Sequence, residues 1–504
     1  MRATAVSILA IGLALSACGP NAAPAPKQDF TVLSSAHAAT PDPLPYPTQV
    51  FFGDTHLHTL NSGDAILNGV RLTPEDALRF AQGEKIKSTT GIDAQLDRPL
   101  DFLLIADHAE LIGTGREIHD GAPYLMTDQT IKRWNRMMHG TRDEAQQAQR
   151  ELVTDYSQGK LPAVMSDPVN SKRIIQSTWD SYVSTVERYN NPGKFTAFLG
   201  YEFTSTPKGN NLHRIVMFRD GAERVGKVLP FSALNGADPE KLWAYMANYE
   251  TTTGGQVLAI PHNSNLSNGL MFAMDDFRGN ALTVDYARRR QRWEPIAEAT
   301  QIKGDSEAHP FLSPNDEFAD FGKAGWDIGN LDNSTAKANA MLPGDYVREA
   351  LKRGLLLQEK LGVNPFKFGM IGSTDSHTGL ATADDNNYYG KFSSVEPRGD
   401  RATEVGTTGD ARGRMGWHYL ASGYAAVWAK ENTRSAIFDA MMRKETYATT
   451  GPRMKVRFFG GWDFSKSDLK NDWVAAGYGR GVPMGGDLKR SKGKAPTFLV
   501  SALK

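Results

Sequence analysis

The segment Phe52-Gly-Asp-Thr-His-Leu-His-Thr59 carries two histidines, His56 and His58, directly behind the apolar run Val50-Phe51-Phe52. Side chains alternate between the two faces of a strand, so a His-x-His pair points both imidazoles to the same face. Two neutral imidazoles that converge at a strand end form one half of a transition-metal site. The segment therefore predicts a buried strand that ends at a metal centre.

Four further segments place a histidine or an acid at the end of an apolar run. A barrel of parallel strands presents its catalytic face where the strands end, so these side chains are expected to meet there. The four segments are Asp101–Glu110 with Asp107 and His108, Phe198–Glu202 followed by His213, Leu258–Asn263 with His262, and Gly369–His377 with Asp375 and His377.

Short apolar runs alternate with helical stretches from about residue 48 onward, which is typical of a parallel sheet covered on both faces. We therefore expect an α/β fold, a closed or distorted β/α barrel related to the TIM barrel, over residues 48–455. The polar region 111–178 is predicted to be a helical insertion over the barrel mouth. The region 381–421 is predicted to be a long loop or lid. Residues 456–504 are expected to form a small β appendage, whose abrupt ending suggests a truncated module.

The balance of charges argues against a nucleic-acid partner. The 504 residues include 57 Lys and Arg and 57 Asp and Glu, so no basic field is expected. At 40% hydrophobic and 23% charged residues, the composition is that of an ordinary globular protein.

The N-terminal sequence is typical of a secretion signal. Arg2 precedes the apolar run Val6–Leu15, and small residues lead to Cys18, the only cysteine of the chain. Leu15-Ser-Ala-Cys18 resembles a bacterial lipobox, whose cysteine becomes the lipidated first residue of the mature protein. We expect residues 1–17 to be a lipoprotein signal peptide and residues 18–47 a flexible tether. The protein would be a cell-envelope lipoprotein held in the outer membrane, facing the periplasm.

The ordered set of motifs resembles the polymerase and histidinol phosphatase (PHP) superfamily of metal-dependent phosphoesterases. The resemblance covers roughly residues 48–380. More narrowly, the chain looks like a secreted bacterial branch known as domain of unknown function 3604. The stretches that carry this narrower resemblance are Gly53–His58, Ala106–Glu110, Gly200–Glu202 and Tyr447–Pro452.

The PHP resemblance implies a cluster of two or three metals. One metal would be bound by His56, His58, Glu202 and Asp375. Glu202 would bridge to a second metal, completed by His213 and His262. A third metal would take Asp64, His108 and His377, with Asp107 as a partner of a ligand rather than a ligand.

Mixed imidazole and carboxylate ligands suit Zn²⁺, Mn²⁺ or Fe²⁺. Closely spaced metals activate a water and clamp the oxygens of an in-line displacement, which fits a small phosphate ester. Glu202 and Asp375 would then be catalytic, and Arg214 is our first choice for holding the phosphoryl group. Lys303 and Arg453 are further choices for that role.

Two alternatives stay open at this point. An amidohydrolase-like enzyme that cleaves C–N or C–O bonds also uses a His-x-His barrel, and a bridging lysine at a strand end would favour it. A non-catalytic, metal-binding envelope lipoprotein would instead show a degenerate ligand set. Every expected ligand position carries a residue that can bind metal, so the phosphoesterase is the leading hypothesis.

Overall fold

The computed structural model describes residues 44–157, 160–404, 414–420, 422–470, 472–491 and 493–503. The predicted signal peptide, Cys18 and the tether up to residue 43 lie outside these ranges. Within them, no helix combines the length and the apolar character needed to cross a membrane.

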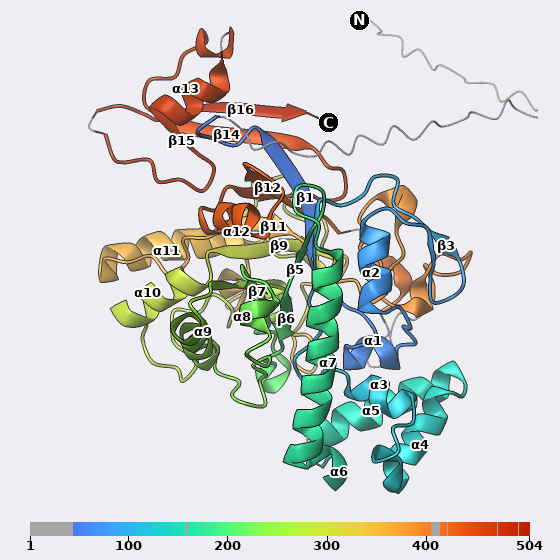
Figure 1. Ribbon diagram of the computed structural model, residues 1–504. Helices are drawn as coiled ribbons and strands as arrows, with labels where there is room; N and C mark the ends of the chain where they lie inside the picture. Colours follow the sequence, from blue (N-terminus) through green and yellow to red (C-terminus); the bar gives the residue numbers. More distant parts are fainter. Residues whose placement is uncertain are drawn as a thin grey trace, which may run out of the picture. The chain divides into compact units, whose positions relative to one another are not determined.

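The central strands form three hydrogen-bonded sheets (Figure 1). In the first, β1 and β5 run parallel to β4, whereas β12 runs antiparallel to its neighbours. The first sheet has the order β13 (Thr446–Ala448), β12 (Ala425–Ala429), β1 (Gln49–Leu57), β4 (Phe102–Ile105) and β5 (Thr196–Phe198); the second is β6 (Gly200–Phe203), β7 (Arg214–Phe218) and β8 (Val257–Pro261); the third is β10 (Gly304–Asp305), β9 (Ile296–Gln301) and β11 (Gly369–Gly372).

The mixed α/β class is confirmed, and within the described residues no sheet closes on itself through hydrogen bonds. The expectation of parallel strands needs correction, because β6, β7 and β8 pair antiparallel. The link from β6 to β7 contains only a short 3₁₀ turn, Pro207–Gly209, and a parallel return needs a longer crossover.

Helices occupy the stretches between the strands, and the sequence marks several of their starts. Thr73 and Asp76 form a reciprocal capping box in front of α2, and Asp238 caps α9 ahead of a proline. The helices are α1 (Gly63–Leu67), α2 (Pro74–Ala81), α3 (Thr114–His119), α4 (Gln129–Met138), α5 (Arg142–Ser157), α6 (Ala163–Ser166), α7 (Pro168–Tyr189), α8 (Ala222–Val225), α9 (Pro239–Thr253), α10 (Val284–Trp293), α11 (Val347–Leu361), α12 (Arg434–Met442) and α13 (Trp473–Arg480).

The region 111–178 folds into helices α3 to α6 and the first half of α7, which pack on one another (Figure 1). Their shared core includes Ile118, Trp134 and Met165, and it also takes in Ile66 and Leu67 of α1. Helix α1 directly follows the His-x-His segment. The helical region is therefore packed beside the strand end that carries His56 and His58.

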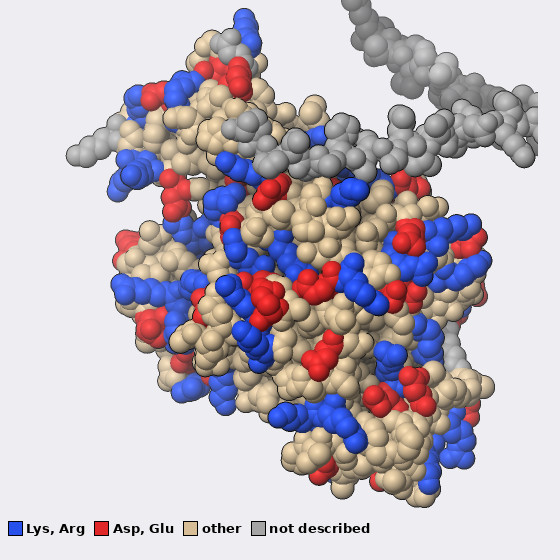
Figure 2. Space-filling view, viewed as in Figure 1, with Lys and Arg blue, Asp and Glu red and all other residues tan. Residues whose placement is uncertain are grey.

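The C-terminal part forms a separate three-stranded antiparallel sheet. Its order is β15 (Gly481–Pro483), β14 (Lys455–Gly461) and β16 (Thr497–Leu503), and α13 packs on β14 through Trp473 and Tyr478. A short hairpin, β2 (Ile86–Lys87) with β3 (Asp93–Ala94), completes the strands. On the face shown in Figure 2, Lys and Arg side chains are interspersed with Asp and Glu, without a field of one sign.

Candidate metal centre

The strand ends bring every predicted ligand into one cluster. His56 lies in β1 and His58 directly follows it, Glu202 lies in β6, and His262 follows β8. The bridges Leu57–Ser376 and His108–Glu202 tie the sheets together at this point. Asp375 has a φ of 52°, an unfavourable conformation for a residue other than glycine that is common at functional sites.

Glu202 is the centre of the cluster. Its carboxylate is 1% exposed, and both oxygens face imidazoles. The oxygens lie 2.7 to 3.3 Å from ring nitrogens of five histidines: His56, His58, His108, His213 and His262.

Asp375 and Asp64 complete the cluster on either side of Glu202. Asp375 Oδ1 lies 3.3 Å from His56 Nε2 and 3.4 Å from His58 Nε2. Asp64 Oδ2 lies 2.7 Å from His377 Nε2 and 3.4 Å from His108 Nε2. Asp64 is the more open of the two, with a third of its side chain exposed.

Three groups of side chains each bring ligand atoms close enough together to hold a metal ion. Their composition differs in part from the expected sets, because His58 joins His108 and His377, and His56 joins Glu202 and His262. The groups are His58 with His108 and His377, His56 with Glu202 and His262, and His56 with His58 and Asp375.

Buried ring nitrogens without hydrogen-bond partners are a second observation that fits metal binding by these residues. His58 Nε2 and His213 Nδ1 are buried without a hydrogen-bond partner, although they lie 3.2 and 2.7 Å from Glu202 oxygens. Buried polar atoms are normally hydrogen-bonded. These two ring nitrogens lie close to the Glu202 oxygens without forming hydrogen bonds to them. Nitrogen and carboxylate lone pairs in this arrangement can bind the same cation.

Neighbouring side chains orient the imidazoles. Glu298 Oε2 lies 3.0 Å from His56 Nδ1, which turns His56 Nε2 toward Glu202. Asp107 acts through Ser62, whose hydroxyl donates to Asp107 at 2.9 Å and lies 2.8 Å from His58 Nδ1. The Asp107 carboxylate accepts from Thr59 and Ser62, so it is placed as a partner of a ligand rather than as a ligand.

The ionisation of the cluster favours cation binding. Burial lowers the pKa of His213 to about 4 and that of His377 to about 3, so both rings are neutral at neutral pH. Burial opposes ionisation of Glu202, but His108 and His262 outweigh it and hold the carboxyl pKa well below its usual range. His108 is the exception, because Glu202 and Asp64 overcome its burial and raise its pKa to about 10.

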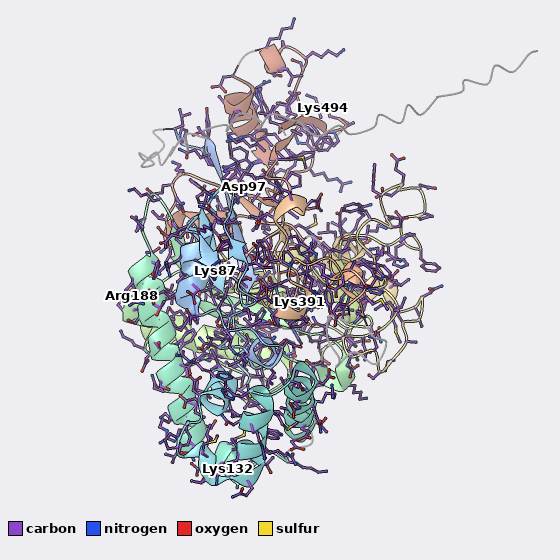
Figure 3. The ribbon with its side chains drawn as sticks, turned by 90° about the vertical axis from the view of Figure 1, so that its right-hand side faces the viewer. Lys87, Asp97, Lys132, Arg188, Lys391 and Lys494 are labelled. Carbon is purple, nitrogen blue, oxygen red and sulfur yellow. The ribbon has the colours of Figure 1, made fainter. Side chains whose placement is uncertain are left out.

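Two lysines bind Asp375. Lys303 Nζ lies 2.5 Å from Asp375 Oδ2, and Lys391 Nζ lies 2.6 Å from Oδ1 and 2.8 Å from His377 Nδ1. Figure 3 shows Lys391 inside the molecule, in contrast to Lys132 and Lys494 at its periphery. Burial lowers the pKa of Lys391 to about 7, whereas Asp375 and Glu202 overcome the burial of Lys303 and raise its pKa.

Arg214 does not reach the cluster, which corrects the expectation that it binds substrate. Its guanidinium is 2% exposed and donates to Glu294 at 3.0 Å and to the Leu212 carbonyl. Since successive residues of a strand face opposite sides, His213 and Arg214 cannot both point at the metal centre. Arg453 is also directed elsewhere, because it donates to the carbonyls of Arg98 and Pro99.

Sequence reasoning missed Glu298 and Lys391. Glu298 carried a signal, since it is an acid within the apolar strand Ile296–Gln301 and such an acid needs a buried partner. No feature of the sequence marks Lys391, because it lies in the long region 381–421, which contains no recognisable motif.

These observations define the chain as a mixed α/β protein with a candidate multinuclear metal centre. It belongs to the family described as "Protein of unknown function (DUF3604)", which matches residues 45–504.

No curated protein matches the chain. Among solved structures it is similar to a two-domain protein from Bacteroides vulgatus ATCC 8482, described as containing a "predicted PHP-like metal-dependent phosphoesterase". The two share 11% identity over 81% of this chain and 67% of the other, with a TM-score of 0.31. At that TM-score the likeness carries no argument, so the functional proposal rests on the site itself.

Proposed function

We propose that the protein is a metal-dependent phosphoesterase that cleaves small phosphate esters. The carrying observation is the single buried carboxylate of Glu202 among five histidines, next to Asp375 and Asp64. When bound there, divalent ions of Zn, Mn or Fe would acidify a water and neutralise charge on phosphoryl oxygens. Two or three ions match the three groups of ligand atoms.

The same arrangement supports membership of the PHP superfamily with a distorted barrel. The three central sheets adjoin one another, because β4 lies beside β6, β8 beside β9, and β11 beside β12 and β13. The strands therefore follow one another around a ring even though their hydrogen bonds do not close it. All the proposed ligands lie where these sheets meet.

Each residue has a distinct task in this proposal. Glu202 would hold two ions, because each of its oxygens faces its own set of imidazoles. Glu298 fixes the ring of His56. Lys303 takes the role first assigned to Arg214: its ammonium lines the pocket beside His108 and Asp64 and is 14% exposed, so it can meet a phosphoryl oxygen.

Lys303 does not suit the role of the bridging lysine in the amidohydrolase-like alternative. A lysine that bridges metals as a carbamate must first be a neutral amine. Lys303 lies 2.5 Å from Asp375, and its pKa is raised, so it stays an ammonium at neutral pH. Glu202 would take the bridging position instead.

Removal of metal is the direct test of the reaction class. We expect chelation to abolish turnover of phosphate monoesters and diesters, and Mn²⁺ or Zn²⁺ to restore it, because the ligands lose their common cation. Metal content and rate should be measured on the same samples. If reloaded protein cleaves amides or lactones but no ester of a broad phosphate panel, the phosphoesterase assignment is wrong.

Replacement of Lys303 tests phosphoryl binding. We expect Lys303→Met to lower kcat/KM for phosphate esters by about 10- to 100-fold, the usual contribution of a charge-assisted hydrogen bond. Metal content should not fall, since an ammonium has no lone pair to give a metal. The matched control is Lys323→Met, which removes another buried lysine paired with an aspartate, Asp305 at 2.7 Å. Equal kcat/KM in the two variants would exclude Lys303 from substrate binding.

A further inference from the structure

A pocket of about 260 Å³ opens beside the metal centre. At one end it is lined by Asp64, His108, His213 and Lys303, all of them members of the cluster or in contact with it. A molecule in this pocket would therefore have one end at the ligands.

The rest of the wall is largely apolar. Leu67 comes from α1, Leu111 precedes α3, Leu152 lies on α5, and Leu331 lies in the loop between β10 and α11. Two of these four, Leu111 and Leu152, belong to the helical region 111–178. None of the pocket residues comes from the described part of region 381–421. The helical region therefore supplies part of the pocket wall, together with α1 and the loop that carries Leu331.

Polar groups in the wall already have partners. The Thr204 hydroxyl lies 2.7 Å from His108 Nδ1, and the Thr206 hydroxyl lies 2.8 Å from His213 Nε2. The Glu110 carboxylate accepts from the backbone N–H of Thr204 and of Ala233. A substrate rich in hydroxyl groups would lose its water without gaining bonds from these side chains, which is unfavourable.

The volume limits the size of the apolar group. A cavity of roughly 150 Å³ lined by aliphatic and aromatic side chains holds a benzene molecule. A benzene-sized group would leave roughly 110 Å³, about the share of three to four water molecules, for the phosphoryl group. The pocket is also smaller than those that bind drug-sized ligands, which start at about 300 Å³.

We propose that the substrates are phosphate esters of a small apolar alcohol, about the size of a benzyl group, held between Leu67, Leu111, Leu152 and Leu331. The inference rests on the proposed phosphoesterase function and adds the substrate class. The phosphoryl end lies at Lys303 and the metal ligands. The apolar end lies against the helical region.

The test compares benzyl phosphate with ethyl phosphate, which have similarly basic alkoxide leaving groups, and with glucose 6-phosphate, a bulky polar ester. We expect the metal-loaded protein to show a kcat/KM for benzyl phosphate at least about tenfold above both others, because several more apolar carbons enter the pocket. Calorimetric binding of benzylphosphonate against ethylphosphonate, neither of which has an ester bond to cleave, gives a readout independent of turnover.

Leu152→Asn and Leu331→Asn should each reduce the benzyl preference by about tenfold in both measurements. Leu331 is only half-buried, so its variant should fold even if the Leu152 variant does not. The matched control is Leu355→Asn, on α11, whose side chain is 66% exposed away from the pocket.

The outcomes separate the two proposals. Equal binding of the two phosphonates by the wild-type protein, or a benzyl preference unchanged in both leucine variants, overturns the substrate class. Tight binding of benzylphosphonate that depends on Leu152 or Leu331, without turnover of any phosphate ester, supports the apolar pocket and overturns the phosphoesterase.

Discussion

The variant Glu202→Gln is expected to lose at least one metal ion per chain and to reduce phosphoesterase activity by more than about 100-fold. The change keeps the size of the side chain but removes its charge and exchanges one acceptor oxygen for a donor. Replacing a group that only hydrogen-bonds to a metal ligand already lowers metal affinity or activity by about 10- to 100-fold. Glu202 faces the imidazoles directly with both oxygens, so its loss should exceed that range.

The comparison that isolates the bridging role is His377→Ala. His377 and Glu202 each belong to one group of ligand atoms, but the two oxygens of Glu202 face five histidines in all. Metal content, measured by elemental analysis after dialysis, should therefore fall further in the Gln variant. Equal metal content in Glu202→Gln and wild type would rule out the bridging role.

A second control separates metal loss from the loss of any buried carboxylate. Glu396 is 1% exposed and accepts from the hydroxyls of Ser88 and Thr90, and within the described residues it belongs to no group of candidate metal ligands. Glu396→Gln should leave metal content unchanged. A comparable metal loss in this variant would point to general unfolding rather than to coordination by Glu202.

Most of the secondary structure could be predicted because the local signals were strong. The apolar run Arg214–Phe218 forms β7, and the capped stretch Pro74–Ala81 forms α2. Strand direction was not predictable in the same way. A strand buried on both faces shows the same apolar run whether its neighbour is parallel or antiparallel. The sequences of β6 to β8 therefore do not indicate that these strands pair antiparallel.

Most of the cluster could be predicted because most of the ligands lie at the end of an apolar run, although Asp64 lies in α1 and His213 directly precedes β7. The groups that hold the ligands in place could not. Lys391 reaches Asp375 from 16 residues along the chain, through a loop with no periodic pattern. Only the folded backbone makes that contact, and no local feature of the sequence marks it.

The error at Arg214 has a different origin. A positive charge next to a ligand in a strand does not predict a substrate contact, because strand alternation places neighbouring side chains on opposite faces. The two side chains in fact serve different parts of the protein. His213 faces Glu202, and Arg214 faces Glu294 together with Arg290.

Arg214→Met is therefore expected to destabilise the fold by about 1.5–3 kcal/mol, the usual contribution of a hydrogen bond to a charged group, because Arg290 still neutralises Glu294. Arg214 and Glu294 are each 2% exposed, and after the substitution one Glu294 oxygen keeps only the neutral donor Trp243. The measurement is urea unfolding of the variant and wild type at matched metal content.

The matched control is Arg219→Met, one residue beyond the same strand. Arg219 pairs with Asp439 at 2.9 Å, but both side chains are substantially exposed, so its loss should cost only about 0–1 kcal/mol. In the folded fraction of Arg214→Met, kcat/KM for phosphate esters should stay within a few-fold of wild type, because the guanidinium lies on the far face of β7. If Arg214→Met has normal stability but a large loss in kcat/KM, Arg214 contacts the substrate after all. The structure requires the opposite result, because Arg214 is 2% exposed and, unlike Lys303, does not line the pocket beside the metal centre.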